Sequence, residues 1–279
     1  CPKVIENFEP EKYDGYFINI KITKLKTKYN FPCSSVLTDS GIRHFTNDLV
    51  GKNIYMDKTG LEDLIRFQGV EYEFIKGYYY DEGRNETIKE TMKYLFTQRL
   101  KYKKMKNPIQ MVFKELMNSS YGKTFMKPID SDNMYIPKKK LEKYINYHFN
   151  SIKEITPCID GKRYKIKLMK PIDNHFNNVP CGVEILSMSK RIMYEVMTLA
   201  EDKKYPVYIT DTDSLHIDTK CVPLLADDFM KKYNRELIGK GLGQFHTDFE
   251  LKGSCGEIIA TDCVFLGKKC YVDRLKSVD

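Results

Sequence analysis

A short acidic segment that interrupts an apolar run constrains this chain most. Tyr208 to Ser214 reads Tyr-Ile-Thr-Asp-Thr-Asp-Ser, and it lies between Val207 on one side and Leu215 and Ile217 on the other. Apolar, β-prone residues on both sides of a brief polar interruption predict a β-hairpin. We therefore expect two antiparallel strands with acidic residues at the tip between them.

Asp211 and Asp213 are the acidic residues of this segment. Side chains alternate faces along a strand, so acids at i and i+2 are expected to point to the same side. Neighbouring carboxylates repel each other unless a cation lies between them, and Mg²⁺ is commonly held by one or two carboxylates together with phosphate oxygens of a substrate. The pair predicts a metal site, with a solvated turn as the alternative because Asp, Thr and Ser are common turn residues.

Two further segments accompany this hairpin. Residues 114–122 read Lys-Glu-Leu-Met-Asn-Ser-Ser-Tyr-Gly, and residues 269–271 read Lys-Cys-Tyr. Together with the acidic segment, and in this order, they resemble the motifs of family B DNA polymerases: a Lys ahead of a Tyr-Gly pair in the fingers, Tyr-x-Asp-Thr-Asp-Ser in the palm, and Lys-x-Tyr where the primer is gripped. The resemblance covers most of the chain, which corresponds to a core section of such a polymerase.

The resemblance implies an α+β fold in which a polymerase palm, an antiparallel sheet with packed helices, carries a helical-hairpin fingers subdomain and mixed insertions. Residues 1–85 are expected to hold a palm strand and an insertion that resembles a terminal-protein-region segment. Residues 86–125 form the fingers hairpin and residues 126–185 a second insertion. Residues 186–279 form the palm with the catalytic hairpin and the primer-gripping strand.

Hydrophobic spacing places the individual elements. Apolar residues at spacings of three and four predict helices, and alternation of apolar and polar residues predicts strands. Gly122 is expected to close the second fingers helix, Thr59-Gly60 to form a turn, and Ser187 or Ser189 to cap the palm helix. The predicted helices are 86–106, 109–121, 138–152, 186–203 and 223–238, and the predicted strands are 13–25, 52–56, 70–80, 162–169, 244–251, 256–266 and 269–273.

The fingers helices carry basic residues that suit a triphosphate. Arg99 and Lys103 are four residues apart and share a helix face, and folding the hairpin can bring Lys114 beside them. Arginine binds phosphate oxygens bidentately, and the resemblance assigns Lys114 to the phosphates of the incoming nucleotide. For Arg99 and Lys103 a solvated basic face is an equal alternative, because Lys101 and Lys104 lie around the same turns.

Three more fingers residues are assigned to the incoming nucleotide by the same resemblance. Asn118 and Tyr121 are expected to pack against the nascent base pair and its sugar, and Gly122 to allow close approach of the backbone. The local alternatives are a polar group at a helix end, a core aromatic residue and a helix C-cap.

The resemblance implies nucleotidyl transfer at the acidic segment. Asp213 is expected to be a metal ligand, with Asp211 nearer the primer end. The primer 3′-hydroxyl attacks the α-phosphorus of a deoxynucleoside triphosphate and releases pyrophosphate. Two Mg²⁺ ions, for which Mn²⁺ can substitute, would stabilise the attacking and leaving oxygens.

Four residues are expected to contact the primer and the DNA. Thr212 and Ser214 neighbour the acids, and Lys269 and Tyr271 belong to the primer-gripping motif. If Lys269 and Tyr271 alternate along one strand, they face the same side and can contact the primer backbone. His216 is expected to be an ordinary polar residue of a strand.

One family element has no counterpart in this sequence. Family B polymerases also use an Asp followed closely by Ser-Leu-Tyr-Pro, which supplies another metal-binding carboxylate and excludes ribonucleotides. Neither the Leu-Thr-Asp-Ser of residues 37–40 nor the Phe-Glu-Leu of residues 249–251 matches it. In the family this motif precedes the fingers, and an exonuclease domain and a thumb also lie outside the core section. The chain is therefore expected to be incomplete as an enzyme by itself.

The inserted segments predict a subfamily and its partners. Extra residues before the fingers, and between Gly122 and Tyr208, resemble those of protein-primed family B polymerases from viruses, linear plasmids and virus-like DNA elements. In that subfamily the insertions contact a terminal protein, whose hydroxyl primes synthesis, and encircle the template. The expected partners are a DNA primer–template, deoxynucleoside triphosphates and a terminal protein.

Composition agrees with an intracellular partner of nucleic acid. The formal net charge of +8 suits a polyanion. No apolar stretch approaches the roughly 20 residues that span a bilayer, and no signal-peptide core follows the first residues, so no membrane partner is expected. The eight cysteines form no Cys-x-x-Cys and no zinc-like spacing, which predicts reduced thiols in a reducing intracellular compartment, nuclear or cytoplasmic.

Two other functions compete with a polymerase. A catalytically inactive, nucleic-acid-binding polymerase remnant would fit the missing carboxylate motif, and it would bind primer–template without incorporating nucleotides. A metal-dependent glycosyltransferase with an Asp-x-Asp pair would fit Asp211 and Asp213, but it leaves residues 114–122 unexplained.

Overall fold

The computed structural model describes residues 2–81, 83, 86–170, 177–251, 256–267 and 269–278. The chain divides into two compact units, one made of Cys1–Arg84 with Glu184–Asp279 and the other of Asn85–Val183. Helices and antiparallel sheets occur in both units, so the predicted α+β class is confirmed. No helix among the described residues is long and apolar enough to cross a membrane.

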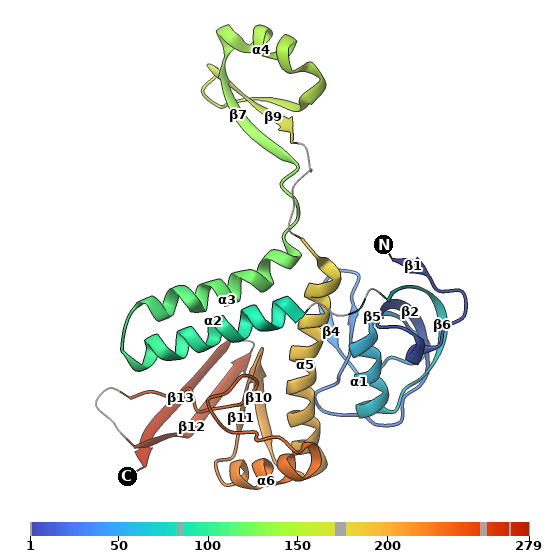
Figure 1. Cartoon of the computed structure of the whole chain (residues 1–279), viewed down its shortest axis with the longest axis vertical. Helices are drawn as coiled ribbons and strands as arrows, with labels where there is room; N and C mark the ends of the chain where they lie inside the picture. Colours follow the sequence, from blue (N-terminus) through green and yellow to red (C-terminus); the bar gives the residue numbers. More distant parts are fainter. Residues whose placement is uncertain are drawn as a thin grey trace. The chain divides into compact units, whose positions relative to one another are not determined.

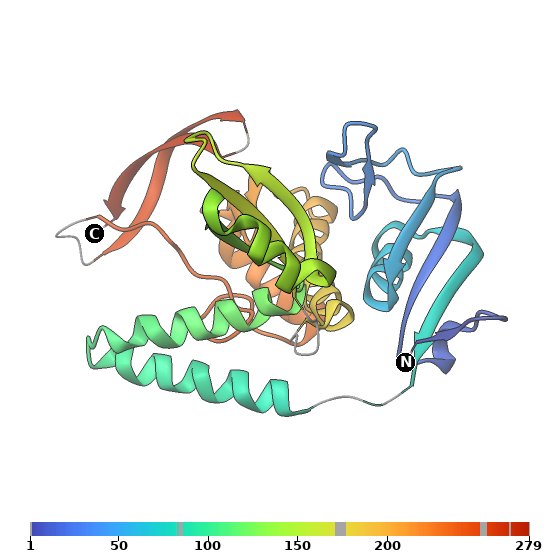
Figure 2. The same ribbon diagram turned by 90° about the horizontal axis from the view of Figure 1, so that it is seen from above.

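The first unit begins with a four-stranded antiparallel sheet in the order β1-β6-β2-β5. Helix α1 packs on one face of this sheet (Figures 1 and 2). Alternate residues of β2 face the helix, and Ile18, Ile20 and Ile22 are at most 1% exposed. The elements are β1 (Lys3–Val4), a 3₁₀ turn (Pro10–Lys12), β2 (Gly15–Lys24), the small hairpin β3 (Ser35–Leu37) and β4 (Arg43–Phe45), β5 (Asn53–Asp57), α1 (Lys58–Gln68) and β6 (Glu71–Tyr80).

Helix α1 was not expected, because Thr59-Gly60 was interpreted as a turn. The pair instead lies in the first turn of the helix. Asp57 caps that turn, and its Oδ1 accepts a hydrogen bond from the Gly60 N–H at 3.2 Å. Gly69 ends the helix in the left-handed conformation, with φ of 60°. Both caps satisfy backbone groups that a helix leaves open, and this outweighs the low helix propensity of one glycine.

The long helix α5 (Val179–Asp202) starts earlier than predicted, so neither Ser187 nor Ser189 caps it. Ser187 lies inside the helix, where its hydroxyl donates to Asp57 Oδ1 at 2.8 Å. One face of α5 packs against α6 (Cys221–Tyr233) and the hairpin of β10 (Val207–Asp211) and β11 (Ser214–Ile217). The buried residues of this core are Val196, Leu199, Ala200, Leu225, Phe229 and Leu237.

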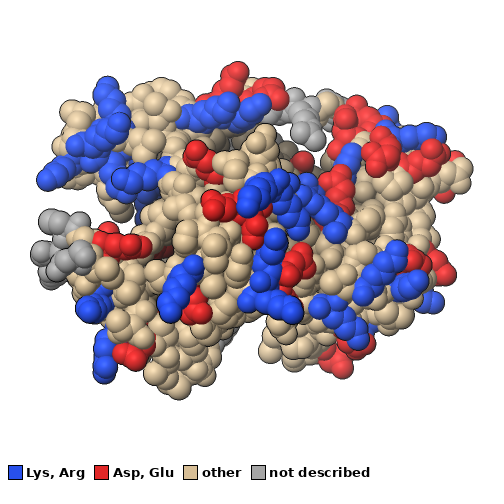
Figure 3. Space-filling view, turned by 90° about the horizontal axis from the view of Figure 1, so that it is seen from below, with Lys and Arg blue, Asp and Glu red and all other residues tan. Residues whose placement is uncertain are grey.

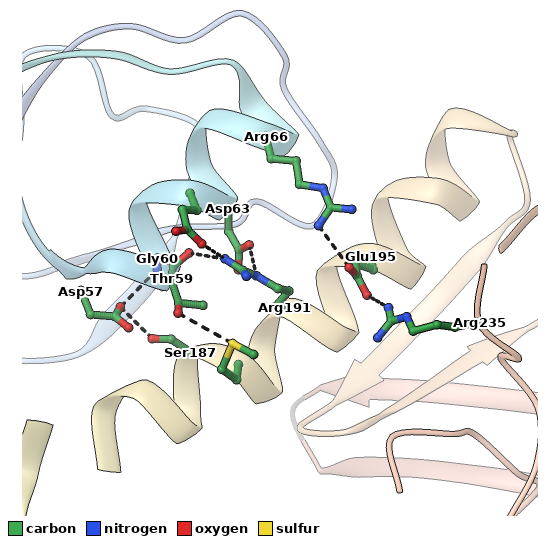
Figure 4. A network of polar contacts seen from close by, with 11 residues as sticks. Asp57, Thr59, Gly60, Asp63, Arg66, Ser187, Arg191, Glu195 and Arg235 are labelled. Atoms are coloured by element: carbon green, nitrogen blue, oxygen red, sulfur yellow. Dashed lines mark hydrogen bonds and ion pairs between the residues drawn. The ribbon is translucent and has the colours of Figure 1, made fainter. Parts of the chain in front are cut away.

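Ion pairs connect α1 to α5 within the first unit (Figure 4). Arg191 donates to Asp63 Oδ1 at 2.5 Å and to the Thr59 carbonyl at 3.1 Å. Glu195, also on α5, accepts from Arg66 at 3.1 Å and from Arg235. The Asp63 and Glu195 carboxylates are nearly inaccessible, and a buried charge is tolerated only when it is paired. The network therefore holds the N-terminal sheet and α1 on the helix that precedes the acidic hairpin.

The first unit ends in the hairpin of β12 (Glu257–Gly267) and β13 (Cys270–Val278). The predicted strands 256–266 and 269–273 are confirmed, although β13 begins one residue late. The predicted strand 244–251 is wrong. Only Phe245 makes an isolated bridge there, to Ile238. The preceding glycine-rich loop is held by Gln244, whose Oε1 accepts from the Gly241 N–H at 2.7 Å, so the backbone turns instead of extending.

The second unit contains the predicted helical hairpin, α2 (Glu86–Lys104) and α3 (Ile109–Phe125), whose helices lie side by side in both ribbon views (Figures 1 and 2). Tyr102 of α2 stacks on Phe113 of α3 at 5.5 Å. The prediction that Gly122 ends α3 is wrong, because the helix continues to Phe125. The Tyr121 and Phe125 rings lie 5.6 Å apart one helical turn from each other, and such a pair stabilises the last turn.

The rest of the second unit is a three-stranded antiparallel sheet in the order β7-β9-β8. Ile166, at the centre of β9, is fully buried. The predicted helix over 138–152 and strand over 162–169 are confirmed, the former as one α-helix between two 3₁₀ turns. The elements are β7 (Ser131–Pro137), a 3₁₀ turn (Lys138–Lys140), α4 (Leu141–His148), a 3₁₀ turn (Phe149–Ser151), β8 (Ile152–Pro157) and β9 (Arg163–Met169).

Candidate functional site

The predicted acidic hairpin is confirmed, with the acids at its tip. Asp211 ends β10 and pairs with Ser214 at the start of β11, so Thr212 and Asp213 form a two-residue turn. The Asp213 N–H donates to the Asp211 carbonyl at 2.7 Å, and the Ser214 hydroxyl donates to the same carbonyl at 3.1 Å. The expectation that both acids sit on a strand is therefore wrong. We call Asp211, Thr212 and Asp213 the acidic tip.

Thr212 has φ of +59°, in the left-handed region. A β-branched residue rarely adopts this conformation, and such strain costs on the order of 1–3 kcal/mol. Its hydroxyl donates to Asp211 Oδ1 at 3.1 Å, which orients the neighbouring carboxylate. Strained positions concentrate at functional sites, so the backbone marks the acidic tip independently of its charge.

Lys269 lies against the acidic tip. Its Nζ is 2.8 Å from Asp211 Oδ1 and 2.9 Å from Oδ2, and this hydrogen bond, with the charge of Asp211, raises the pKa of Lys269. Lys269 has φ of +58° and belongs to the turn before β13, while Tyr271 lies on β13. The expectation that the two residues alternate along one strand is wrong, although the structure does bring Lys269 to the acidic segment.

An open cleft of about 940 Å³ adjoins the acidic tip. Asp213 and Ser214 line it from the hairpin, and Tyr271 lines it from β13. Tyr208 also faces the cleft, and its hydroxyl donates to Asp218 Oδ1 at 2.9 Å. The cleft thus exposes one acidic residue, one hydroxyl and one aromatic ring of the predicted site to the same space.

The carboxylates of the acidic tip are the candidate metal ligands. Within the described ranges, no three His, Cys, Asp or Glu side chains gather in a way that would hold a metal ion. Asp211 and Asp213 nevertheless fit one hard divalent cation, because Mg²⁺ takes one or two protein carboxylates and completes its shell with water and phosphate oxygens. Asp211 forms an ion pair with Lys269. Asp213 is the acid of the tip that lines the cleft.

The predicted nucleotide-binding residues belong to the second unit. Arg99 and Lys103 lie on α2, and Lys114, Asn118 and Tyr121 lie on α3. The stacking of Tyr102 on Phe113 holds the two helices together, so the structure assembles both sets on one helical hairpin. Gly122 lies in the interior of α3, and nothing lies within 4 Å of the position that a Cβ would take, so the helix surface is open there.

Charge is not segregated on the surface seen in Figure 3. Lysine and arginine side chains lie among acidic ones on that face and do not form one uninterrupted patch. The net charge of +8 therefore does not indicate where on this surface a nucleic acid would bind. The specific contacts of the acidic tip carry more information.

Sequence reasoning missed a second contact between the hairpins. His216, expected to be an ordinary polar residue of a strand, is mostly buried and lies 3.2 Å from the Asp273 carboxylate. Pairing between residues so distant in sequence leaves no local pattern. The available signal was the i, i+2 spacing of Tyr271 and Asp273, which places both on one face of β13.

Comparison with known proteins agrees with the three motifs. No protein-family model matches the chain. The chain is 28% identical over 259 residues to a probable DNA polymerase of Ascobolus immersus. That match covers 91% of this chain and 19% of the relative, so the chain spans about a fifth of the relative's length.

Solved structures give the fold. Phi29 DNA polymerase complexed with single-stranded DNA matches all of this chain with a TM-score of 0.58, at 18% identity and over 42% of that chain. A structure of phi29 DNA polymerase complexed with primer-template DNA, the post-translocation binary complex, matches 78% of this chain and 33% of that chain, with 16% identity and a TM-score of 0.47. The fold expected from the motifs is confirmed by the first of these matches.

Proposed function

We propose that this chain is the palm-and-fingers section of a DNA-directed DNA polymerase of family B, which transfers nucleotides from deoxynucleoside triphosphates to a primer 3′-hydroxyl. The observation that carries the proposal is the acidic tip. Its Asp211 is bound by the Lys of the primer-gripping motif, within a fold that matches a DNA polymerase over the whole chain. A glycosyltransferase with an Asp-x-Asp pair gains no support from that match.

Asp213 and Asp211 are the residues that would hold Mg²⁺ or Mn²⁺. A bound cation would supply stabilisation of the negative charge that develops on the oxygens at phosphorus. The two-metal reaction of the family needs a further carboxylate from the Asp-x-x-Ser-Leu-Tyr-Pro type of motif, which this sequence lacks. We therefore assign the activity to the longer protein of which this chain forms a part.

The turn at Lys269 would hold the primer end. A lysine is protonated at neutral pH, and Asp211 raises the pKa of Lys269 further. The ammonium group neutralises one acid of the tip and can offer its remaining N–H donor to a primer phosphate. Tyr271 lines the cleft beside Asp213, where its ring and hydroxyl can contact the terminal sugar or base. Thr212 and Ser214 shape the turn between these groups.

The fingers hairpin would bind the incoming nucleotide. Lys114, with Arg99 and Lys103 on the facing helix, would contact the triphosphate, since charge-assisted bonds to phosphate are the strongest available to side chains. Asn118 and Tyr121 would pack against the base pair and sugar. The open surface at Gly122 supports close approach of the backbone to that pair.

We propose that the enzyme belongs to the protein-primed subfamily. The inserted segments of this chain resemble those of that subfamily, and the likeness in fold to phi29 DNA polymerase supports the polymerase core to which they are attached. The second unit also contains a folded sheet and helix over residues 131–169, where the subfamily has its second insertion. A terminal protein and a DNA primer–template would be the macromolecular partners, and a viral, plasmid or virus-like element would be the source genome.

Template-directed primer extension by the full-length protein tests the proposal. We expect extension with Mg²⁺ and four deoxynucleotides on a primed template, with the order of incorporation set by the template. The matched control is the same template with a primer that lacks the 3′-hydroxyl, which should give no product. Tight binding of primer–template without any extension would instead support the inactive remnant, and extension that ignores the template would contradict the proposal.

A further inference from the structure

A buried polar contact joins the two hairpins of the candidate site. His216 lies on β11, the strand that leaves the acidic tip, and Asp273 lies on β13. The His216 Nε2 and Asp273 Oδ2 atoms are 3.2 Å apart, and the side chains are only 17% and 11% exposed. Because polar side chains are seldom buried without partners, the contact defines how β11 and β13 meet.

The register of the β12–β13 hairpin surrounds His216 with a specific set of side chains. Cys263 pairs with Asp273, and Phe265 pairs with Tyr271, so these four residues share one face of the hairpin. The His216 ring lies 5.4 Å from the Phe265 ring and 5.4 Å from the Tyr271 ring, edge-on at 76° to each. His216 is thus inserted in a niche with aromatic walls and a carboxylate at its polar end.

The niche is part of the cleft. His216, Tyr271 and Asp273 line the cleft together with Asp213, and the ring of Tyr271 contacts that of His216. His216 follows Asp213 closely along the hairpin, so both are carried by the same rigid element. Any shift of β13 against β11 would therefore move Tyr271 relative to Asp213.

The Asp273 carboxylate has partners on two neighbouring strands. Its Oδ2 atom is 3.2 Å from His216 Nε2. The thiol of Cys263, the cross-strand partner of Asp273, also hydrogen-bonds to the carboxylate, and burial together with this bond raises the pKa of Cys263 to about 11. Hydrogen bonds weaken steeply when their geometry is lost, so the bond to His216 fixes the register of β11 against β13 more sharply than apolar packing would.

We propose that His216 and Asp273 form a positioning pair, which holds β13 in register with the acidic tip so that Tyr271 presents the primer terminus to Asp213. The inference rests on the proposed function. In this proposal His216 and Asp273 act through Tyr271, while the Lys269–Asp211 pair holds the exposed end of the same interface.

Single-turnover nucleotide incorporation by the full-length protein tests the pair. His216→Phe keeps an aromatic ring in the niche and removes the bond to Asp273, and Asp273→Asn keeps the shape of the side chain. Misplacement of a reacting group by about 1 Å can cost about 100-fold in rate. We expect His216→Phe to lower the maximal incorporation rate per active site by about 10- to 100-fold, with less than a threefold change in the deoxynucleotide Kd.

Two comparisons separate positioning from simple stability. His216→Gln, which can still hydrogen-bond to Asp273, should recover most of the rate that His216→Phe loses. The double variant His216→Phe with Asp273→Asn should be no slower than His216→Phe alone, because the side chain at position 273 has already lost its partner on the ring in the single variant. Asp262→Asn is the matched control on the same hairpin. That carboxylate is 64% exposed and pairs with Arg274 at 3.3 Å, and its loss should leave the rate unchanged.

A readout without chemistry keeps the inference separate from the proposed function. A primer with 2-aminopurine at its 3′ end reports how the terminal base is seated in the bound complex. We expect His216→Phe to change that fluorescence while the DNA Kd stays within threefold. Unchanged fluorescence and an unchanged rate per active site would overturn the inference. Changed fluorescence in a protein that never extends primers would support the pair and contradict the polymerase.

Discussion

The Nζ atom of Lys269 lies between the two carboxylate oxygens of Asp211, 2.8 Å from one and 2.9 Å from the other, so the turn before β13 is bound to the acidic tip. Lys269 is mostly exposed and Asp211 is partly exposed. A pair with this exposure contributes little to folding, because solvent screens it. We therefore expect the pair to matter for the placement of Lys269, because it holds a cation beside the cleft where a primer phosphate would lie.

Lys269→Ala should weaken primer–template binding and leave the stability of the fold nearly unchanged. Loss of one phosphate contact is expected to reduce the slope of log K against log salt by about 1. Fluorescence anisotropy over a series of salt concentrations measures that slope. Lys12→Ala, which breaks an exposed pair with Glu9 at 2.6 Å in the same unit, is the control. A Lys269→Ala slope equal to that of the wild type would contradict the assignment.

Arg191→Ala should destabilise the first unit strongly. Arg191 pairs with the buried Asp63 and with Glu62 across the α1–α5 interface (Figure 4). Removing one partner of a buried pair leaves an uncompensated charge and costs about 3–5 kcal/mol. Urea unfolding measures the change in the free energy of unfolding. Lys12→Ala should have a much smaller effect because its ion pair is exposed, and similar losses in both variants would show that the network is not what holds α1 to α5.

The stability of the first unit should depend on the titration of Asp63. Burial raises the pKa of Asp63 to about 6, although Arg191 acts in the opposite direction. The ordinary value is 3.8, so between roughly pH 4 and pH 6 the folded state binds more protons than the unfolded state. The contribution of this group to stability therefore falls as pH rises through that window and is constant above it.

Asp63→Asn removes this titratable group, so comparison with the wild type measures how the group contributes to stability. The difference in unfolding free energy between the wild type and Asp63→Asn should decline from pH 4 to pH 6 and then level off. Urea unfolding at several pH values gives the difference directly. A difference that rises with pH in this window would show that Arg191 dominates over burial and would reverse the sign of the prediction.

Lys114→Ala should weaken the use of deoxynucleotides without abolishing the binding of DNA. A charge-assisted hydrogen bond is worth about 1.5–3 kcal/mol, which corresponds to about a 10- to 100-fold loss in kcat/KM for the incoming nucleotide. Steady-state incorporation by the full-length protein measures it. Lys123→Ala, in the last turn of the same helix, is the control. An equal loss in the two variants would show that the effect comes from the general positive charge of α3 and not from a specific contact of Lys114.

The sequence was most informative where a pattern repeats locally. The alternation of apolar residues around Tyr208–Ser214 predicted the β10–β11 hairpin, and the spacing of apolar residues predicted α2 and α3. It could not place Asp213 in a two-residue turn, because Thr212 is an unusual residue for the left-handed conformation that this turn requires. It also could not show that α3 passes through Gly122, since the ring contact that stabilises the last turn depends on the helix already being formed.

The sequence alone could not predict contacts between segments that are far apart in the chain. Asp57 caps α1 and accepts from Ser187 of α5, which explains both the unexpected helix and the failure of Ser187 as a cap. The bond between His216 and Asp273 likewise joins strands that are far apart in the sequence. The motifs identified the residues of the candidate site, but only the packing of the hairpins shows which of them meet.

The rate of single-nucleotide incorporation by the full-length protein carrying Asp213→Asn tests the central claim most directly. The substitution keeps the size of the side chain and removes the charge that would hold a divalent cation at the cleft. We expect a loss of at least about 1,000-fold, the scale seen when an electrostatic contribution to phosphoryl transfer is removed, with DNA binding retained. Asp262→Asn should behave as the wild type does. An Asp213→Asn protein that incorporates nucleotides at the wild-type rate would contradict the account.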